Sequence, residues 1–208
     1  RAEKVIDRFP LRQTASGYFL SQDGEWDSNG EALWIMRRFC ELTGKKPNPK
    51  WRGPVYRGAA WLKAKRISNK ESPYFGLLPI GFSAEHLGPN DYYYWDDFWG
   101  VAGFQASAYL AGQFGDSELV DEFSNEASEF LSCIEKSLGA RHGQTGGPFM
   151  PASPHRRMDA GCIGSIAAGY PLQLFASNDA RLVNTAEFLF KECFFQGGFF
   201  QEISHSGI

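Results

Sequence analysis

Two adjacent carboxylates, Asp96 and Asp97, lie within a run of aromatic residues, GPNDYYYWDDFWG, at positions 88–100. Adjacent helical positions point about 100° apart, so both carboxylates cannot face a core. Burial against rings and a neighbouring acid both raise the pKa of a carboxyl group. The run therefore predicts an active site with a general acid that stays protonated near neutral pH and rings on which a sugar stacks. The alternative is a solvated first helical turn on a packed aromatic cluster.

Other acidic residues stand just before or at the start of predicted helices. They are Glu25 and Asp27 in QDGEWDSNG, Asp159 in HRRMDAG and Glu202 in FFQEISHSG. A helix cap or a first-turn acid also explains Asp27 and Asp159. Glu25 precedes the cap and adjoins Trp26, so capping explains it less well. For Glu202 the functional and the structural interpretation both stay open.

Weaker candidates come from two loops. Glu85 and His86 lie in SAEHLGPND, close to the aromatic run, and both could contact a ligand. In SPHRRMDAG we expect one of Arg156 and Arg157 to be solvated and the other to be ion-paired or to face a ligand.

Nucleophile and phosphate motifs give no signal in this chain. Ser165, His142 and His155 match neither a nucleophile elbow nor a cysteine–histidine pattern. Neither common glycine-rich phosphate loop is present in the sequence.

Composition narrows the classes of partner. The net charge is −3, which argues against a nucleic-acid partner. No run of 18 apolar residues occurs, so we expect no membrane span. The content of 18 Phe, 8 Tyr and 6 Trp is high and suggests a ring-lined cleft beside the core.

The four cysteines are far apart in apolar segments and form no CxxC motif, which predicts buried free thiols, no zinc site and a cytoplasmic location; they are Cys40, Cys133, Cys162 and Cys193. We expect no metal and no cofactor.

Helical periodicity dominates the chain and groups its helices in pairs that recur at roughly 65 residues. The predicted helices cover residues 27–44, 51–66, 93–114, 117–138, 160–176 and 180–195. Connections within a pair are short, whereas the connections over 9–26, 67–92 and 139–158 are long. Long loops are often functional. Because each one enters the first helix of a pair, we expect them to gather at one end of the helical array.

Three segments, each entering the first helix of a pair, resemble the six-hairpin glycosidases, the superfamily that includes glucoamylases. They are SQDGEWDSNGEALWIM, YYYWDDFWGVAGFQASAYLA and RRMDAGCIGSIAAGYPLQL. In glucoamylase-like enzymes a tryptophan is followed by the general-acid glutamate. The same place in this chain holds Trp95 followed by Asp96, whose side chain is one methylene shorter.

The resemblance implies an all-α fold of repeated helical hairpins, with residues 1–208 as one helical-hairpin domain that forms about half of an (α/α)6 toroid. A closed toroid has six hairpins, so we expect the rest of the catalytic domain as a partner and no catalysis by these residues alone. The resemblance places the second catalytic carboxylate outside the chain. Glu25 and Glu202 would face each other across the funnel as sugar-binding or alternative catalytic groups.

The resulting hypothesis is an inverting glycoside hydrolase with an oligosaccharide substrate. Asp96 is the expected acid, Asp97 holds sugar hydroxyls and Glu25 is a further catalytic candidate. The expected substrate-binding residues are Trp26, Asp27, Glu85, His86, Tyr94, Trp95, Trp99, Arg157, Asp159 and Glu202. The alternatives are an inactive carbohydrate-binding (α/α)6 module, and a glycoside phosphorylase or sugar epimerase, for which His86 and His205 are the visible acid/base candidates.

Overall fold

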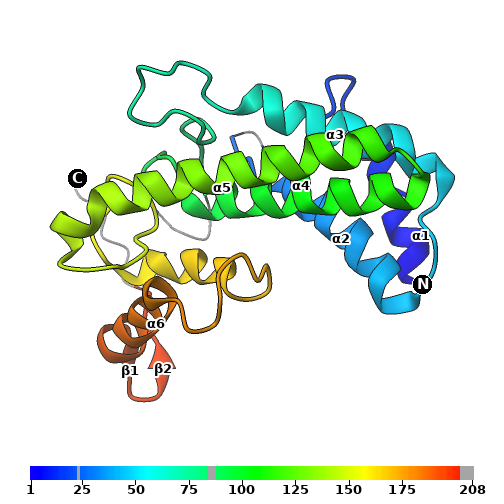
Figure 1. The fold of residues 1–208 in the computed structure, drawn as a ribbon. Helices are drawn as coiled ribbons and strands as arrows, with labels where there is room; N and C mark the ends of the chain where they lie inside the picture. Colours follow the sequence, from blue (N-terminus) through cyan, green and yellow to red (C-terminus); the bar gives the residue numbers. More distant parts are fainter. Residues whose placement is uncertain (23, 84–87, 202–208) are drawn as a thin grey trace. The chain divides into compact units, whose positions relative to one another are not determined.

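The computed structural model describes residues 1–22, 24–83 and 88–201 and is mostly helical (Figure 1). This confirms the all-α expectation, while the (α/α)6 arrangement stays a prediction. The chain divides into two compact units, Arg1–Arg66 with Trp99–Ser132 (unit 1) and Ile67–Phe98 with Cys133–Ile208 (unit 2). Helices α4 (Tyr94–Phe114) and α5 (Ser117–Thr145) each have residues in both units. No helix of the described residues is both long and apolar enough to cross a membrane.

Unit 1 contains short N-terminal helices and the longer helices α2 (Ser28–Thr43) and α3 (Arg52–Lys65), together with parts of α4 and α5. Its other elements are α1 (Ala2–Ile6), η1 (Phe9–Arg12) and η2 (Pro49–Trp51), where η marks a 3₁₀ helix. Helix α2 ends at Thr43 and is followed by Gly44, whose φ of 67° is left-handed and favours glycine. Helix α3 buries an apolar stripe of Val55, Ala59 and Leu62, each 0% exposed.

Two glycines let α2 and α4 approach closely within unit 1. A Cβ atom on Gly30 would collide with the backbone carbonyl of Trp99. A Cβ atom on Gly103 would lie 2.9 Å from the Cα atom of Gly30. The backbones of the two helices therefore meet where neither carries a side chain.

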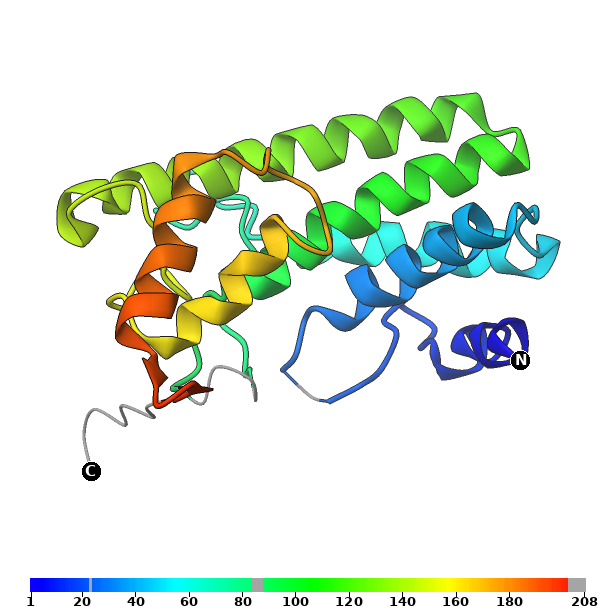
Figure 2. The same ribbon diagram turned by 90° about the horizontal axis from the view of Figure 1, so that it is seen from below.

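Unit 2 holds η3 (Ala160–Ala168), α6 (Ala180–Glu192) and the strands β1 (Phe194–Phe195) and β2 (Gly198–Phe199). Helices η3 and α6 lie side by side (Figure 2). Ala160, Cys162, Leu189 and Cys193 form a buried cluster between them. The strands pair antiparallel, with Phe194 opposite Phe199.

The predicted bounds of α5, η3 and α6 differ from the structure. Helix α5 continues to Thr145 instead of ending at Leu138, because the turn comes only at Gly146 and Gly147, which both have positive φ. The element expected over 160–176 is a 3₁₀ helix that ends at Ala168. Glycines lower helix propensity and Pro171 lacks a backbone donor, so the sequence after Ala168 does not sustain a helix.

The C-terminal end of the third pair is also shorter than predicted. Helix α6 ends at Glu192, and Phe194 and Phe195 form a strand because Gln196 and Gly197 both adopt positive φ and turn the chain back. The connection expected over 9–26 contains η1, which the periodicity did not reveal.

Of the four predicted free thiols, Cys40, Cys162 and Cys193 are buried and Cys133 is half-buried. Burial raises the pKa of Cys162 to about 12, so this thiol stays protonated.

Candidate functional site

Backbone pairs join the described parts of the long connection that precedes α4. The amide of Ile67 donates to the carbonyl of Leu77 at 2.8 Å, which closes a first loop. Gly81 and Asp91 exchange two backbone hydrogen bonds of 2.9 and 3.1 Å, which close a second. Both loops lie in the sequence between α3 and the acidic first turn of α4.

Asp97 ties that connection to α4. Its side chain is 0% exposed, and its Oδ1 accepts a 2.8 Å hydrogen bond from the backbone amide of Leu78. A buried amide needs such an acceptor. The geometry therefore shows Asp97 positioning the loop, whereas its expected contact with sugar hydroxyls stays a prediction.

Asp96 occupies the same first turn and is 2% exposed. It lies close enough to Tyr93 for its charge to influence the pKa of that phenol. Burial raises the pKa of Tyr93, and the charges of Asp91 and Asp96 raise it further, whereas Arg156 lowers it. The hydroxyl of Tyr93 donates to the carbonyl of Pro89 at 2.6 Å. Trp95, the residue before Asp96, is half-buried.

An arginine–carboxylate pair adjoins Tyr93. Arg156 Nη2 lies 2.6 Å from Asp159 Oδ2, and both side chains are about nine-tenths buried, at 11% and 10% exposed. The other oxygen of Asp159 accepts the amide of Gly161 at 2.8 Å, which confirms the capping interpretation of this residue. Arg156 is thus the ion-paired residue and Arg157 the exposed one, while the substrate contact expected for Arg157 stays untested.

The aromatic run is divided between packing roles. Tyr94 is 0% exposed and its hydroxyl lies 2.8 Å from the hydroxyl of Ser137, so its ring belongs to the core of unit 2. Trp99 belongs to unit 1, where it is 7% exposed and meets the ring of Trp34 edge-on at 5.5 Å.

The first acidic segment lies in unit 1. Glu25 is 7% exposed and its Oε1 accepts a 3.1 Å hydrogen bond from Gln22. The ammonium nitrogen of Lys65 lies over the ring of Trp26, 3.6 Å from its centroid, in a cation–π contact. Asp27 precedes α2 at its N-cap position, without a side-chain capping bond. Burial raises the pKa of the neighbouring Tyr18, and the charges of Asp27 and Glu25 add to this.

Several predicted residues lie outside the described part of the chain: Glu85, His86, Glu202 and His205.

Sequence reasoning missed a second polar cluster in unit 2. Hydrogen bonds connect Asp91 to both Ser153 and His155, and His155 to Tyr74. Asp91 Oδ1 lies 2.6 Å from His155 Nδ1. His155 Nε2 in turn lies 2.6 Å from the hydroxyl of Tyr74. Tyr74 and His155 are 81 positions apart, and no motif in the sequence links them.

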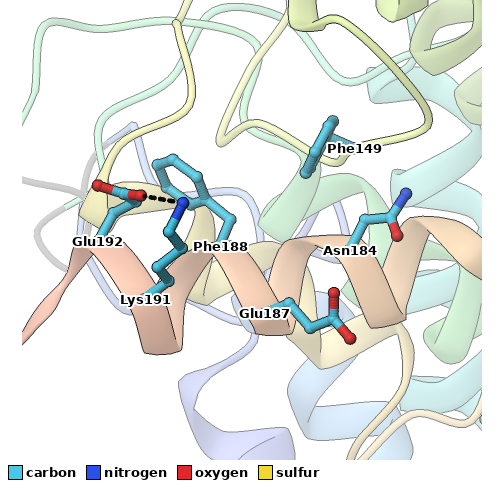
Figure 3. Close-up of a pocket in the computed structure, with 6 residues that line it drawn as sticks. All are labelled: Phe149, Asn184, Glu187, Phe188, Lys191 and Glu192. Carbon is cyan, nitrogen blue, oxygen red and sulfur yellow. Dashed lines mark ion pairs between the residues drawn. The ribbon is translucent and has the colours of Figure 1, made fainter.

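A surface pocket of about 230 Å³ lies beside α6 (Figure 3). It contains none of the predicted site residues and is lined by Phe149, Asn184, Glu187, Phe188, Lys191 and Glu192. Its ion pair, Lys191 with Glu192 at 3.3 Å, joins side chains that are 82% and 51% exposed, where such a pair contributes little. The buried polar residues of unit 2 described above, Asp91, Asp96 and Asp97, therefore do not line this pocket.

Among the described residues, no group of three or more histidine, cysteine or acidic side chains is placed to hold a metal ion. The chain matches no family model, no curated protein and no solved structure.

Proposed function

We propose that the protein is an inverting glycoside hydrolase of the (α/α)6 type, acting on oligosaccharides with Asp96 as general acid. The observation that supports this most is the first turn of α4. There two adjacent carboxylates are withdrawn from water, at 2% and 0% exposed, and Asp97 accepts the backbone amide of Leu78. A general acid must hold its proton near neutral pH, and withdrawal from water favours the protonated form of a carboxyl group.

The surroundings of Asp96 suit such a role. Tyr93 places a phenol near it, and Trp95 next to it is a half-buried ring suited to stacking on a sugar. The pair of Arg156 and Asp159 anchors the neighbouring segment at the start of η3. In the reaction Asp96 gives its proton to the glycosidic oxygen. A second carboxylate, about 6.5–9.5 Å away in inverting enzymes, activates the attacking water.

Product stereochemistry tests the proposal. Full-length protein is incubated with maltose-series and other oligosaccharides, and the first-formed product is followed by anomer-resolved NMR. We expect the anomer opposite to that of the substrate. The retained anomer would contradict inversion, binding without turnover would favour a non-catalytic carbohydrate-binding protein, and turnover only with phosphate would favour a phosphorylase.

A further inference from the structure

The cluster of Asp91, His155 and Tyr74 has the connectivity of a carboxylate, an imidazole and a hydroxyl in series. The carboxylate-to-imidazole and the imidazole-to-phenol distances are both 2.6 Å. Because an ionised carboxylate only accepts hydrogen bonds, His155 Nδ1 is the donor to Asp91. His155 Nε2 then presents its lone pair to the hydroxyl of Tyr74.

Asp91 is held rigidly. It is 5% exposed, and it accepts a 2.8 Å bond from the amide of Tyr92 and a 2.5 Å bond from the hydroxyl of Ser153. Its own backbone amide and carbonyl are paired with Gly81. A carboxylate fixed on all these sides orients the imidazole that it binds.

The phenol is held as firmly at the other end of the series. The ring of Tyr74 stacks on the ring of Tyr92, with centroids 4.1 Å apart and planes 19° apart. The side chain of His155 is 52% exposed, so reagents in solution reach this end of the cluster. An oriented hydroxyl, a base in contact with it and access from solvent are the features that activate a nucleophile.

We propose that Asp91, His155 and Tyr74 form a second reactive site, in which Tyr74 accepts acyl groups from activated esters. Tyr74 Oη attacks the ester carbonyl carbon while its proton passes to His155 Nε2. Asp91 stabilises the resulting imidazolium. The alcohol or phenol of the ester leaves with the electron pair of the broken C–O bond and takes that proton. Water, which gives a proton to His155, then attacks the acyl carbon; the C–O bond to Tyr74 breaks, the carboxylic acid leaves, and Tyr74 Oη takes the proton back from His155. The site does not depend on the proposed glycosidase activity.

The test uses p-nitrophenyl acetate, with acetylated residues located and timed by peptide mass spectrometry. Tyr170, 80% exposed, is the control phenol in the same protein. We expect Tyr74 to be acetylated at least about tenfold faster than Tyr170, since general-base assistance contributes about 10²–10⁴-fold. Equal or slower acetylation of Tyr74 in the wild-type protein would overturn the proposal.

Two variants separate reactivity from a purely structural link. His155→Gln keeps an amide oxygen that can accept the Tyr74 hydrogen bond but removes the base, and we expect the Tyr74 rate to fall to that of Tyr170. An unchanged rate in this variant would overturn the proposal. Asp91→Asn tests the positioning role: ¹⁵N NMR should show loss of the Nδ1–H tautomer of His155 together with slower acetylation, whereas an unchanged tautomer would contradict it.

Discussion

The neighbouring carboxyl groups of Asp96 and Asp97, on the first turn of α4, differ in their contacts. Asp97 accepts the amide of Leu78 and holds the preceding loop, whereas we propose a chemical role for Asp96. From the sequence, the resemblance alone assigned the two residues different roles, since both adjoin aromatic side chains. The structure adds that the amide of Leu78, 19 residues away, donates to Asp97.

Replacement of Asp97 should therefore reduce stability. Asp97→Ala leaves the buried amide of Leu78 without its acceptor, and we expect the free energy of unfolding to fall by about 1–3 kcal/mol. Asp97→Asn keeps an acceptor oxygen and should lose less. Urea denaturation measures both, with the exposed Glu187→Ala as a control expected within about 0.5 kcal/mol of wild type. A wild-type midpoint and slope for Asp97→Ala would refute this role.

At the scale of elements, Asp179 caps the N-terminus of α6. Asp179 Oδ1 accepts the amide of Arg181 at 2.9 Å, and its Oδ2 lies 2.6 Å from Arg181 Nη2. The hydrogen bonds from Arg181 lower the pKa of Asp179 below its ordinary value of 3.8, and burial opposes this in part.

Asp179→Ala should cost about 1 kcal/mol of unfolding free energy through the lost cap. Asp179→Asn should keep most of the cap but lose the charge. Because the folded-state pKa is lowered, the stabilisation by the charge is present above the ordinary carboxyl pKa and disappears as the pH falls through the lowered value. Thermal unfolding of wild type and Asp179→Asn should therefore converge in acid. A difference that stays constant from pH 7 to pH 2 would rule out this linkage.

The elements that sequence predicted well are those in which periodicity and end signals agree. Helix α2 begins after Asp27 and stops at Gly44, and α4 stops at the Gly115 turn, within a residue of expectation. The prediction failed for η3, whose small apolar residues suit either helix type. It also failed after Glu192, where the turn at Gln196 and Gly197 creates a strand pair.

Sequence also predicts only some of the residue groupings in the candidate sites. Residues three positions apart, such as Tyr93 and Asp96, could be grouped from the sequence, because one helical turn brings them together. The link from Tyr74 to His155 could not, since it depends on how two long connections pack within unit 2. Tertiary contacts over such separations leave no periodic signal.

For the whole molecule, the high aromatic content serves the core more than the sequence suggested. Trp51, Tyr93, Tyr94, Phe98 and Phe104 are among the largest fully buried side chains. Several exposed rings lie instead at the C-terminal end of α6, on the strand pair and just after it: Phe190, Phe194, Phe195, Phe199 and Phe200. Composition counts rings but does not say which face they occupy, so a ring-lined cleft remains a prediction.

The central claim, that Asp96 is the general acid of a glycosidase, is tested most directly by Asp96→Asn in the full-length protein. Oligosaccharide hydrolysis and calorimetric sugar binding are measured together, with exposed Asp121→Asn as the matched control. We predict that hydrolysis falls at least about 100-fold, while the dissociation constant stays within about threefold, as expected when an interaction made only in the transition state is removed, and Asp121→Asn behaves as wild type. Hydrolysis by Asp96→Asn at the wild-type rate would contradict the claim.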